Sequence, residues 1–204
     1  AVKAIVDLNT QRSLDPLVKA TSDNDPEIQI RAAEGLINFY QPGFTESGRT
    51  APIKRIGKGI KGKFVETNDQ VIDSFVEVRP EVIQALGKLA RGGSSLESRA
   101  NAARGLGILR GREAVPDLIE AVKSKDDQVI YEALIALEKI HDESAGPAVA
   151  LRLRDPSEKI QVTAIEATGI LQNKAALYKV RDAMDRSKNM KVRRAALTTI
   201  AMLP

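Results

Sequence analysis

The stretch of this 204-residue sequence that most resembles a chemical site is a glycine- and lysine-rich string, IKRIGKGIKGKF at 53–64. Three of its glycines satisfy G-x-G-x-x-G, the spacing with which a backbone turn binds a dinucleotide phosphate. Such a turn needs a strand before it and a helix after it, whereas Pro52 and several positive charges precede this one. A nucleotide phosphate loop would need Ser or Thr to hold magnesium where the chain has Phe64. The match is therefore predicted not to bind a nucleotide, and no cofactor is expected.

The same string is the basic part of the chain. Residues 49–63 hold six basic side chains and no acid. Because the net charge of the whole chain is +4, the rest of the chain has a net charge of 4 − 6 = −2. The apolar residues of the string recur every three or four positions, with the basic ones mostly opposite, a layout that suits an acidic protein surface, a phosphate backbone or anionic lipid. Equally, its isoleucines and Phe64 could pack the segment on the rest of the chain while the lysines stay solvated. The side chains expected to contact a partner here are Lys54, Arg55, Lys58, Lys61 and Lys63.

Other candidates for chemistry are few. With no Cys and one His, the chain cannot form a disulfide, a thiol nucleophile, a Cys-based zinc site or a site with two histidines. His141 falls at the end of an expected helix, where a histidine interacts favourably with the helix dipole. Asp126, Asp127 and Asp155 stand where helices need N-terminal caps. No catalytic residue and no metal site are predicted.

A repeat organises most of the chain. Several helical segments share one spacing of small residues. A β-branched or small residue is followed four positions later by an alanine, and another small residue comes three positions after that alanine. The alanines are Ala32, Ala102, Ala133, Ala164 and Ala196. They are 70, 31, 31 and 32 residues apart. Apolar residues around each alanine form one stripe, which a single pair of helices cannot bury but a stack of pairs can. The sequence therefore predicts an all-α protein, an α-solenoid of about five helical hairpins with one irregular insertion.

The repeat resembles a known family. The pattern D-P-x-[VI]-x-x-x-A-x-x-[AG]-L, at Asp25–Leu36 and again without the proline at Asp126–Leu137, is similar to HEAT repeats in their short bacterial form. The resemblance covers about 11–40 and 79–204. It implies an armadillo/HEAT-type superhelix whose second helices line a concave binding face. HEAT-like relatives also include bilin lyases, DNA-alkylation glycosylases and di-iron hydroxylases, but no residues here match these activities, and one histidine cannot supply several His–Glu pairs.

The expected organisation is one continuous solenoid in three parts. Residues 1–40 form the N-terminal repeat or repeats, 41–78 a basic, glycine-rich insertion, and 79–204 four HEAT-like repeats. The step of 70 is interpreted as two periods plus eight, so the insertion is expected to replace a hairpin. Its end, TNDQVIDSFVEV at 67–78, fits either a short helix or an extended segment.

The expected binding surface is the exposed side of the second helices. Its charges are of both signs and include no row of Arg and Lys, which argues against sequence-independent binding to nucleic acid. The residues predicted to contact a partner are Arg31, Arg104, Ile130 and Tyr131. The same surface is expected to include Ile30, Glu34, Asn101, Ile135, Val162, Thr163, Glu166, Arg194 and Thr198.

From these features we predict a non-enzymatic protein–protein interaction scaffold. Its partner is another protein or peptide segment, acidic where it meets the insertion. One alternative is a binder of nucleic acid or anionic membrane through 49–63, and another is an accessory enzyme of the bilin-lyase-like HEAT type. The end of the solenoid that exposes an apolar stripe is expected to dock a further domain or subunit.

The composition is that of a soluble protein, with 43% hydrophobic and 28% charged residues. No apolar run approaches the roughly 18 residues of a membrane span. No signal peptide is visible, and the chain begins with Ala, which fits a leader already removed as well as a trimmed chain. Cytoplasmic and extracytoplasmic locations are both compatible with these features.

Overall fold

The computed structural model describes residues 1–42 and 70–203, so the basic string at 53–64 lies outside the described residues. Within the described part the chain is helical and has no strand. One layer contains α1 (Val2–Leu8), α3 (Pro26–Tyr40), α5 (Leu96–Ile108), α7 (Asp127–Ile140), α9 (Glu158–Ile170) and α11 (Met190–Met202). The other contains α2 (Gln11–Ala20), α4 (Pro80–Gly92), α6 (Val115–Val122), α8 (Gly146–Val149) and α10 (Leu177–Arg186). Short 3-10 turns, Arg112–Ala114, Glu143–Ala145 and Lys174–Ala176, lead into α6, α8 and α10, and another, Ala150–Arg152, follows α8.

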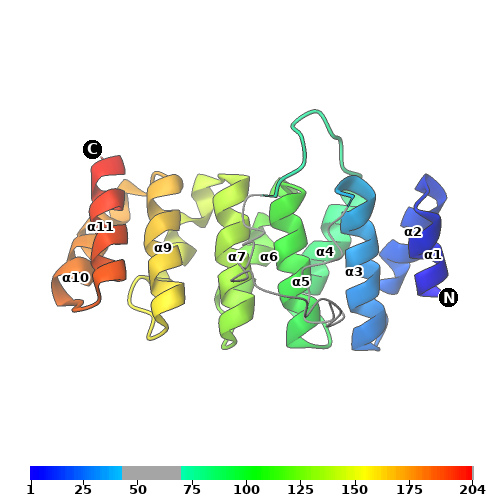
Figure 1. Ribbon diagram of the computed structural model, residues 1–204, viewed down its shortest axis with the longest axis horizontal. Helices are drawn as coiled ribbons and strands as arrows, with labels where there is room; N and C mark the ends of the chain where they lie inside the picture. The colour runs from blue at the N-terminus through cyan, green and yellow to red at the C-terminus, as the bar shows by residue number, and fades with distance from the viewer. Residues whose placement is uncertain (43–69, 204) are drawn as a thin grey trace, which may run out of the picture.

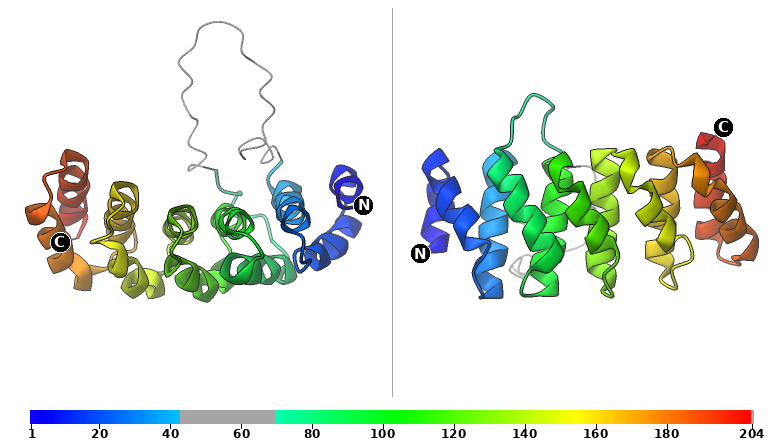
Figure 2. Two further views of the ribbon diagram at one scale, coloured as in Figure 1. Left: turned by 90° about the horizontal axis from the view of Figure 1, so that it is seen from below. Right: turned by 180° about the vertical axis from the view of Figure 1, so that it is seen from behind.

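The two layers form a row of helical hairpins (Figure 1). Helix α1 precedes five pairs, α2–α3, α4–α5, α6–α7, α8–α9 and α10–α11, and each pair packs on the next. Seen along the helices, the row bends so that the layer from α1 to α11 lies on the concave side and the α2-to-α10 layer on the convex side (Figure 2). The predicted α-solenoid of about five hairpins is confirmed.

Small residues let the inner helices approach one another. All five repeat alanines are fully buried. A Cβ added at Gly105 would lie 2.3 Å from Ile37 Cδ1, and one at Gly107 would lie 2.7 Å from Ala136 Cα. These glycines therefore mark the places where α5 meets α3 on one side and α7 on the other.

Of the three aspartates predicted to cap helices, one does so. The Asp126 side chain accepts hydrogen bonds from the backbone N–H groups of Gln128 and Val129, so it caps α7. The prediction that Asp127 and Asp155 are caps is wrong. Asp127 is the first residue of α7, and Asp155 holds the turn before α9 by accepting from Ser157, which is itself the N-cap.

The inner helices end in a repeated backbone conformation. Arg110, His141 and Gln172 follow α5, α7 and α9 with positive φ angles of 49°, 56° and 52°. This left-handed geometry usually requires glycine, and here it occurs at non-glycine residues 31 positions apart. His141 lies at the predicted helix end, where its backbone N–H donates to the Leu137 carbonyl.

The insertion joins neighbouring hairpins. Helix α3 packs directly on α5, so no hairpin is missing between them, and the prediction that 41–78 replaces one is wrong. The 70 residues that separate Ala32 from Ala102 are one repeat period of 32 residues plus the 38 residues of 41–78. The physical reason is that the α3-facing side of α5 is already filled, with Ile37 packed at Gly105.

The described end of the insertion is not helical and contains one turn at residues 74–75. Residues 70–79 arch over the rim of the solenoid, from the ends of α5 and α7 back to the start of α4 (Figure 1). The Ile72 N–H donates to the Ile108 carbonyl at 3.0 Å, and the Arg79 N–H donates to the Tyr40 hydroxyl at 3.2 Å. Both ends of this arch are therefore hydrogen-bonded to inner helices.

Candidate functional site

The concave surface is the candidate site, and helical geometry identifies the side chains that face it. Successive residues of an α-helix are about 100° apart, so positions two before and two after a repeat alanine point away from the hairpin core. On the inner helices these positions are Ile30 and Glu34, Ala100 and Arg104, Tyr131 and Ile135, Val162 and Glu166, and Arg194 and Thr198.

The structure corrects the predicted exposure at the centre of this surface. Ile130 retains 2% of its accessible surface and Tyr131 retains 9%. Ile130 lies three positions before Ala133, on the buried side of α7. Tyr131 does point to the concave side, but the Lys159 ammonium group from α9 lies 3.3 Å from the centre of its ring. Ile135 and Thr163, also expected to be exposed, are buried.

Charged groups from three adjacent inner helices meet at Glu132. Burial raises the pKa of this carboxyl, while the positive charges of Arg104 on α5 and Lys159 on α9 oppose the rise. The amide of Gln128 donates to Glu132 Oε1 at 2.7 Å. The predicted site residue Arg104 thus takes part in an electrostatic network that links α5, α7 and α9.

Glu138 lies six residues further along α7, on the side that faces α9. Burial raises the pKa of its carboxyl to about 8, the negative charge of Glu166 on α9 adds to the rise, and Lys139 opposes it. Its Oε1 is fully shielded and accepts no hydrogen bond from the described residues. A carboxyl in this environment exchanges a proton in the neutral pH range, unlike an exposed glutamate.

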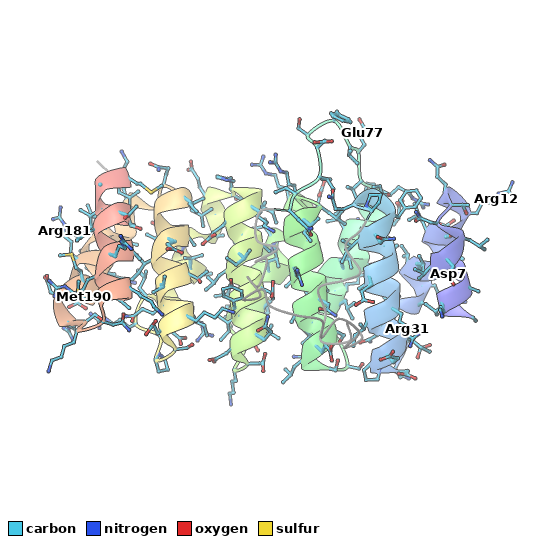
Figure 3. All side chains as sticks on the ribbon, viewed as in Figure 1. Asp7, Arg12, Arg31, Glu77, Arg181 and Met190 are labelled. Atoms are coloured by element: carbon cyan, nitrogen blue, oxygen red, sulfur yellow. The ribbon has the colours of Figure 1, made fainter. Side chains whose placement is uncertain are left out.

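A second group of charges lies toward the N-terminal end of the groove, where Figure 3 marks Arg31 on α3. Arg31 forms an ion pair with Glu27 at 2.7 Å. Burial raises the pKa of Glu34, and the charge of Glu27 adds to this while Arg31 opposes it. The concave surface therefore carries charges of both signs in both groups, in agreement with the expected mixture of charges.

The predicted contact residues do not form one cluster. Arg31 lies on α3 and Arg104 on α5, whereas Ile130 and Tyr131 lie on α7. The five basic residues expected to contact a partner lie outside the described residues. Glu132, Glu138 and Lys159 are not among the residues predicted from the sequence. The signal that could identify Glu138 is a charged side chain five positions after the repeat alanine, where three other repeats have Gly107, Gly169 and Ala201.

Residues 1–42 and 70–203 contain no group of three His, Asp or Glu side chains placed to hold a metal ion. None of the helices in these ranges is both long and apolar enough to cross a bilayer.

The family comparison agrees with this geometry. Residues 83–151, which run from α4 into the turn after α8, match the family model for HEAT repeats. The resemblance to HEAT repeats is confirmed. No curated protein matches the chain in sequence.

Solved structures share the fold at low sequence identity. The complex of CpcE and CpcF of phycocyanin lyase from Nostoc sp. PCC7120 is similar over 93% of this chain and 64% of that one, at 19% identity and a TM-score of 0.65. Human deoxyhypusine hydroxylase is similar over 99% of this chain and 77% of its own, at 18% identity and a TM-score of 0.53. A designed armadillo repeat protein in complex with the peptide (KR)4 is similar over 100% and 91%, at 16% identity and a TM-score of 0.58. The chain thus spans less than two thirds of the first of these relatives.

Proposed function

We propose that this HEAT-repeat chain is a non-enzymatic scaffold that binds a protein or peptide segment on its concave face. The observation that carries the proposal is the charge network of the inner helices, in which Arg104, Glu132 and Lys159 interact across α5, α7 and α9. Side chains held in place by their neighbours lose little conformational entropy on binding, which favours recognition of an extended partner. The likeness to a peptide-bound armadillo protein and to the CpcE–CpcF complex supports an interaction role.

The basic string provides the second contact in this proposal. Lys54, Arg55, Lys58, Lys61 and Lys63 carry five positive charges within ten residues, while the rest of the chain is mildly acidic. An acidic partner segment gains from such a cluster in both association rate and orientation. The concave face and the string thus recognise different parts of one partner.

The proposal is tested by affinity capture from nuclease-treated extract of the source organism at physiological salt. The intact chain is compared with a variant carrying Lys54, Arg55, Lys58, Lys61 and Lys63 changed to Gln, and with the concave variant Arg104→Gln/Glu166→Gln. The matched control is Glu120→Gln/Lys123→Gln, which removes one acid and one base from an ion pair on the convex layer. A protein that the control captures and the concave variant does not supports binding on the concave face. If the basic variant also fails to capture it, the basic string is supported as the second contact.

Other outcomes contradict the scaffold. If no protein is captured, and the intact chain instead binds nucleic acid or anionic vesicles with a steep loss between low and physiological salt, the basic string is a phosphate or membrane binder. A partner that all four chains capture equally places recognition elsewhere on the molecule.

A second candidate is an accessory subunit of the lyase type, because the likeness to the CpcE–CpcF complex extends over 93% of the chain. This function requires a bound bilin chromophore or transfer of one to an acceptor protein. It is tested by adding a bilin to the purified chain and recording the absorption spectrum. An unchanged spectrum, together with no transfer, contradicts it.

A further inference from the structure

The rim arch, residues 70–79, displays an aromatic side chain to solvent. Phe75 is 81% exposed, the highest value among the large hydrophobic residues of the described chain. Phenylalanine is rare in this sequence, with four in 204 residues. Because the Phe75 side chain is exposed, it does not contribute to the hydrophobic core.

The direction of Phe75 follows from its neighbours on the arch. Ile72 is buried, and Val76 and Val78 pack against the hydrophobic core. A turn closed by the Val76 N–H donating to the Asp73 carbonyl at 3.0 Å lies between Ile72 and Val76, and Phe75 points outward from it. The arch thus buries its aliphatic side chains and presents its aromatic one.

The arch is fastened at both ends, which makes Phe75 a preorganised contact. In addition to the backbone bonds at Ile72 and Arg79, the Lys139 ammonium donates to the Gln70 carbonyl at 3.1 Å. The Arg79 guanidinium pairs with Asp15 on α2 at 2.8 Å and with Glu81 at 3.4 Å. An anchor side chain held in its binding position loses less entropy on association than one on a free loop.

The charges around Phe75 identify the chemistry of the partner. Asp73 and Glu77 are both exposed on either side of it, and Figure 3 places Glu77 beside the top of the arch. The only basic side chain of residues 70–79, Arg79, is already paired with Asp15 and Glu81. Two negative charges beside the aromatic ring disfavour insertion into an anionic membrane and favour a protein with basic groups.

We propose that the rim arch is a docking element in which Phe75 enters an apolar pocket of a partner protein while Asp73 and Glu77 meet basic side chains at the edge of that pocket. Buried aromatic anchors dominate the free energy of many interfaces, and charges around them set the orientation. This element lies on the rim, outside the concave surface and the basic string, and does not depend on either of them binding the same partner.

The test begins with p-benzoylphenylalanine at position 75 of the full chain, irradiated in cells of the source organism, with the cross-linked protein identified by mass spectrometry. Position 151 is the control site, because Leu151 is 64% exposed in the 3-10 turn that follows α8 and is far along the chain from the arch. The protein that cross-links at 75 and not at 151 is then purified, and its Kd for the chain is measured by titration calorimetry.

The expected result is that Phe75→Ala weakens this complex by about 10- to 100-fold, whereas Leu151→Ala changes the Kd less than twofold. Asp73→Asn/Glu77→Gln is expected to weaken it most at low salt, because screening reduces exposed charge pairs. The melting temperature of Phe75→Ala should equal that of the parent chain.

Three results overturn the proposal. One is a Kd that Phe75→Ala leaves unchanged, and another is cross-linking to no protein or only to a second copy of this chain. The third is a fall in melting temperature for Phe75→Ala, which would mean that the ring packs into the fold, where a cavity of about 230 Å³ lies under the arch between Ile72, Val76 and Ile83. If concave-face binding is lost while the Phe75 contact stays intact, only the proposal that the concave face binds a partner is contradicted.

Discussion

Glu138 of α7 occupies the repeat position that Gly107 occupies in α5, 31 residues earlier. At Gly107 the missing side chain lets Ala136 Cα of the next inner helix approach to within 2.7 Å of where a Cβ would be. At Glu138 the chain places a carboxyl on the side of α7 that faces α9, where Glu166 is close enough to raise its pKa. The same position therefore joins two inner helices in one repeat and holds an ionisable group between them in the next.

Replacing Glu138 should change how stability depends on pH. The folded-state pKa of about 8 exceeds the ordinary value of 4.5, so between these pH values the folded chain keeps a proton that the unfolded chain has lost. The free energy of unfolding therefore falls as pH rises from 4.5 to 8. Glu138→Gln removes this contribution and is expected to stabilise the chain by roughly 1–3 kcal/mol at pH 8.5, with no gain near pH 4.

Urea unfolding at several pH values measures this effect. Glu113→Gln is the control, because Glu113 is an exposed glutamate in the turn before α6. If Glu138→Gln and the control show the same pH dependence as the parent chain, Glu138 is not a proton-binding group of the folded state.

Gly107→Ala tests whether close approach of inner helices holds the solenoid together. The new methyl group would meet the backbone of α7 at Ala136, which cannot move aside as a flexible side chain can. We expect destabilisation of about 1–3 kcal/mol, even though Ala is a better helix former than Gly by about 1 kcal/mol.

Gly92→Ala provides the matched control in the outer layer. Gly92 is the last residue of α4, and nothing lies within 4 Å of a Cβ added there. Its substitution is expected to be neutral or stabilising by up to about 1 kcal/mol. Thermal unfolding of the two variants distinguishes packing from propensity, and equal shifts would contradict the packing explanation.

The parts of the fold that could be predicted from sequence are those determined within one repeat. The buried alanines, the small residues three positions later and the cap at Asp126 follow from helical periodicity and local hydrogen bonding. The step of 70 residues between Ala32 and Ala102 predicts a missing hairpin wrongly, because a distance along the chain does not state which helices stack. Only the contact of α3 with α5 decides between a missing hairpin and a long connection.

The parts of the candidate site that could not be predicted depend on side chains from other repeats. Tyr131 was expected to be exposed because its position on α7 points to the concave side. The Lys159 ammonium group, 28 residues later on α9, lies over its ring, and no local pattern states where a long flexible side chain lies. The display of Phe75 likewise depends on contacts of the arch with Ile108 and Tyr40.

Arg152 is expected to be a main link between consecutive hairpins. Its guanidinium donates to the Val122 carbonyl at 2.8 and 2.6 Å and to the Ser124 carbonyl at 2.8 Å, and it pairs with Asp155 at 3.1 Å. Because the Asp155 side chain is only 6% exposed, Arg152→Ala leaves a shielded carboxylate and two carbonyls without their donor. We expect a loss of about 2–4 kcal/mol in the free energy of unfolding.

Two further variants separate geometry from charge at Arg152. Arg152→Lys should recover only part of the loss, because one ammonium group cannot span the two carbonyls and the carboxylate as a planar guanidinium does. Arg154→Ala removes an ion pair in which the arginine is 62% exposed and Asp182 keeps its second pair with Arg186, so stability should change by less than about 1 kcal/mol. Denaturant unfolding measures all three, and a full recovery by lysine would show that charge alone matters.

The ends of the inner helices offer sites where glycine should stabilise the chain. His141 and Gln172 adopt positive φ angles of 56° and 52°, a conformation that is unfavourable by roughly 1–2 kcal/mol for a residue with a Cβ. His141→Gly and Gln172→Gly relieve this strain but add conformational entropy to the unfolded chain, so each is expected to stabilise by about 0.5–1 kcal/mol. Alanine at the same positions keeps the strain and should give no gain. A thermal unfolding series with Gly and Ala at each position measures the difference, and an Ala variant as stable as its Gly counterpart would show that the left-handed turn is not strained.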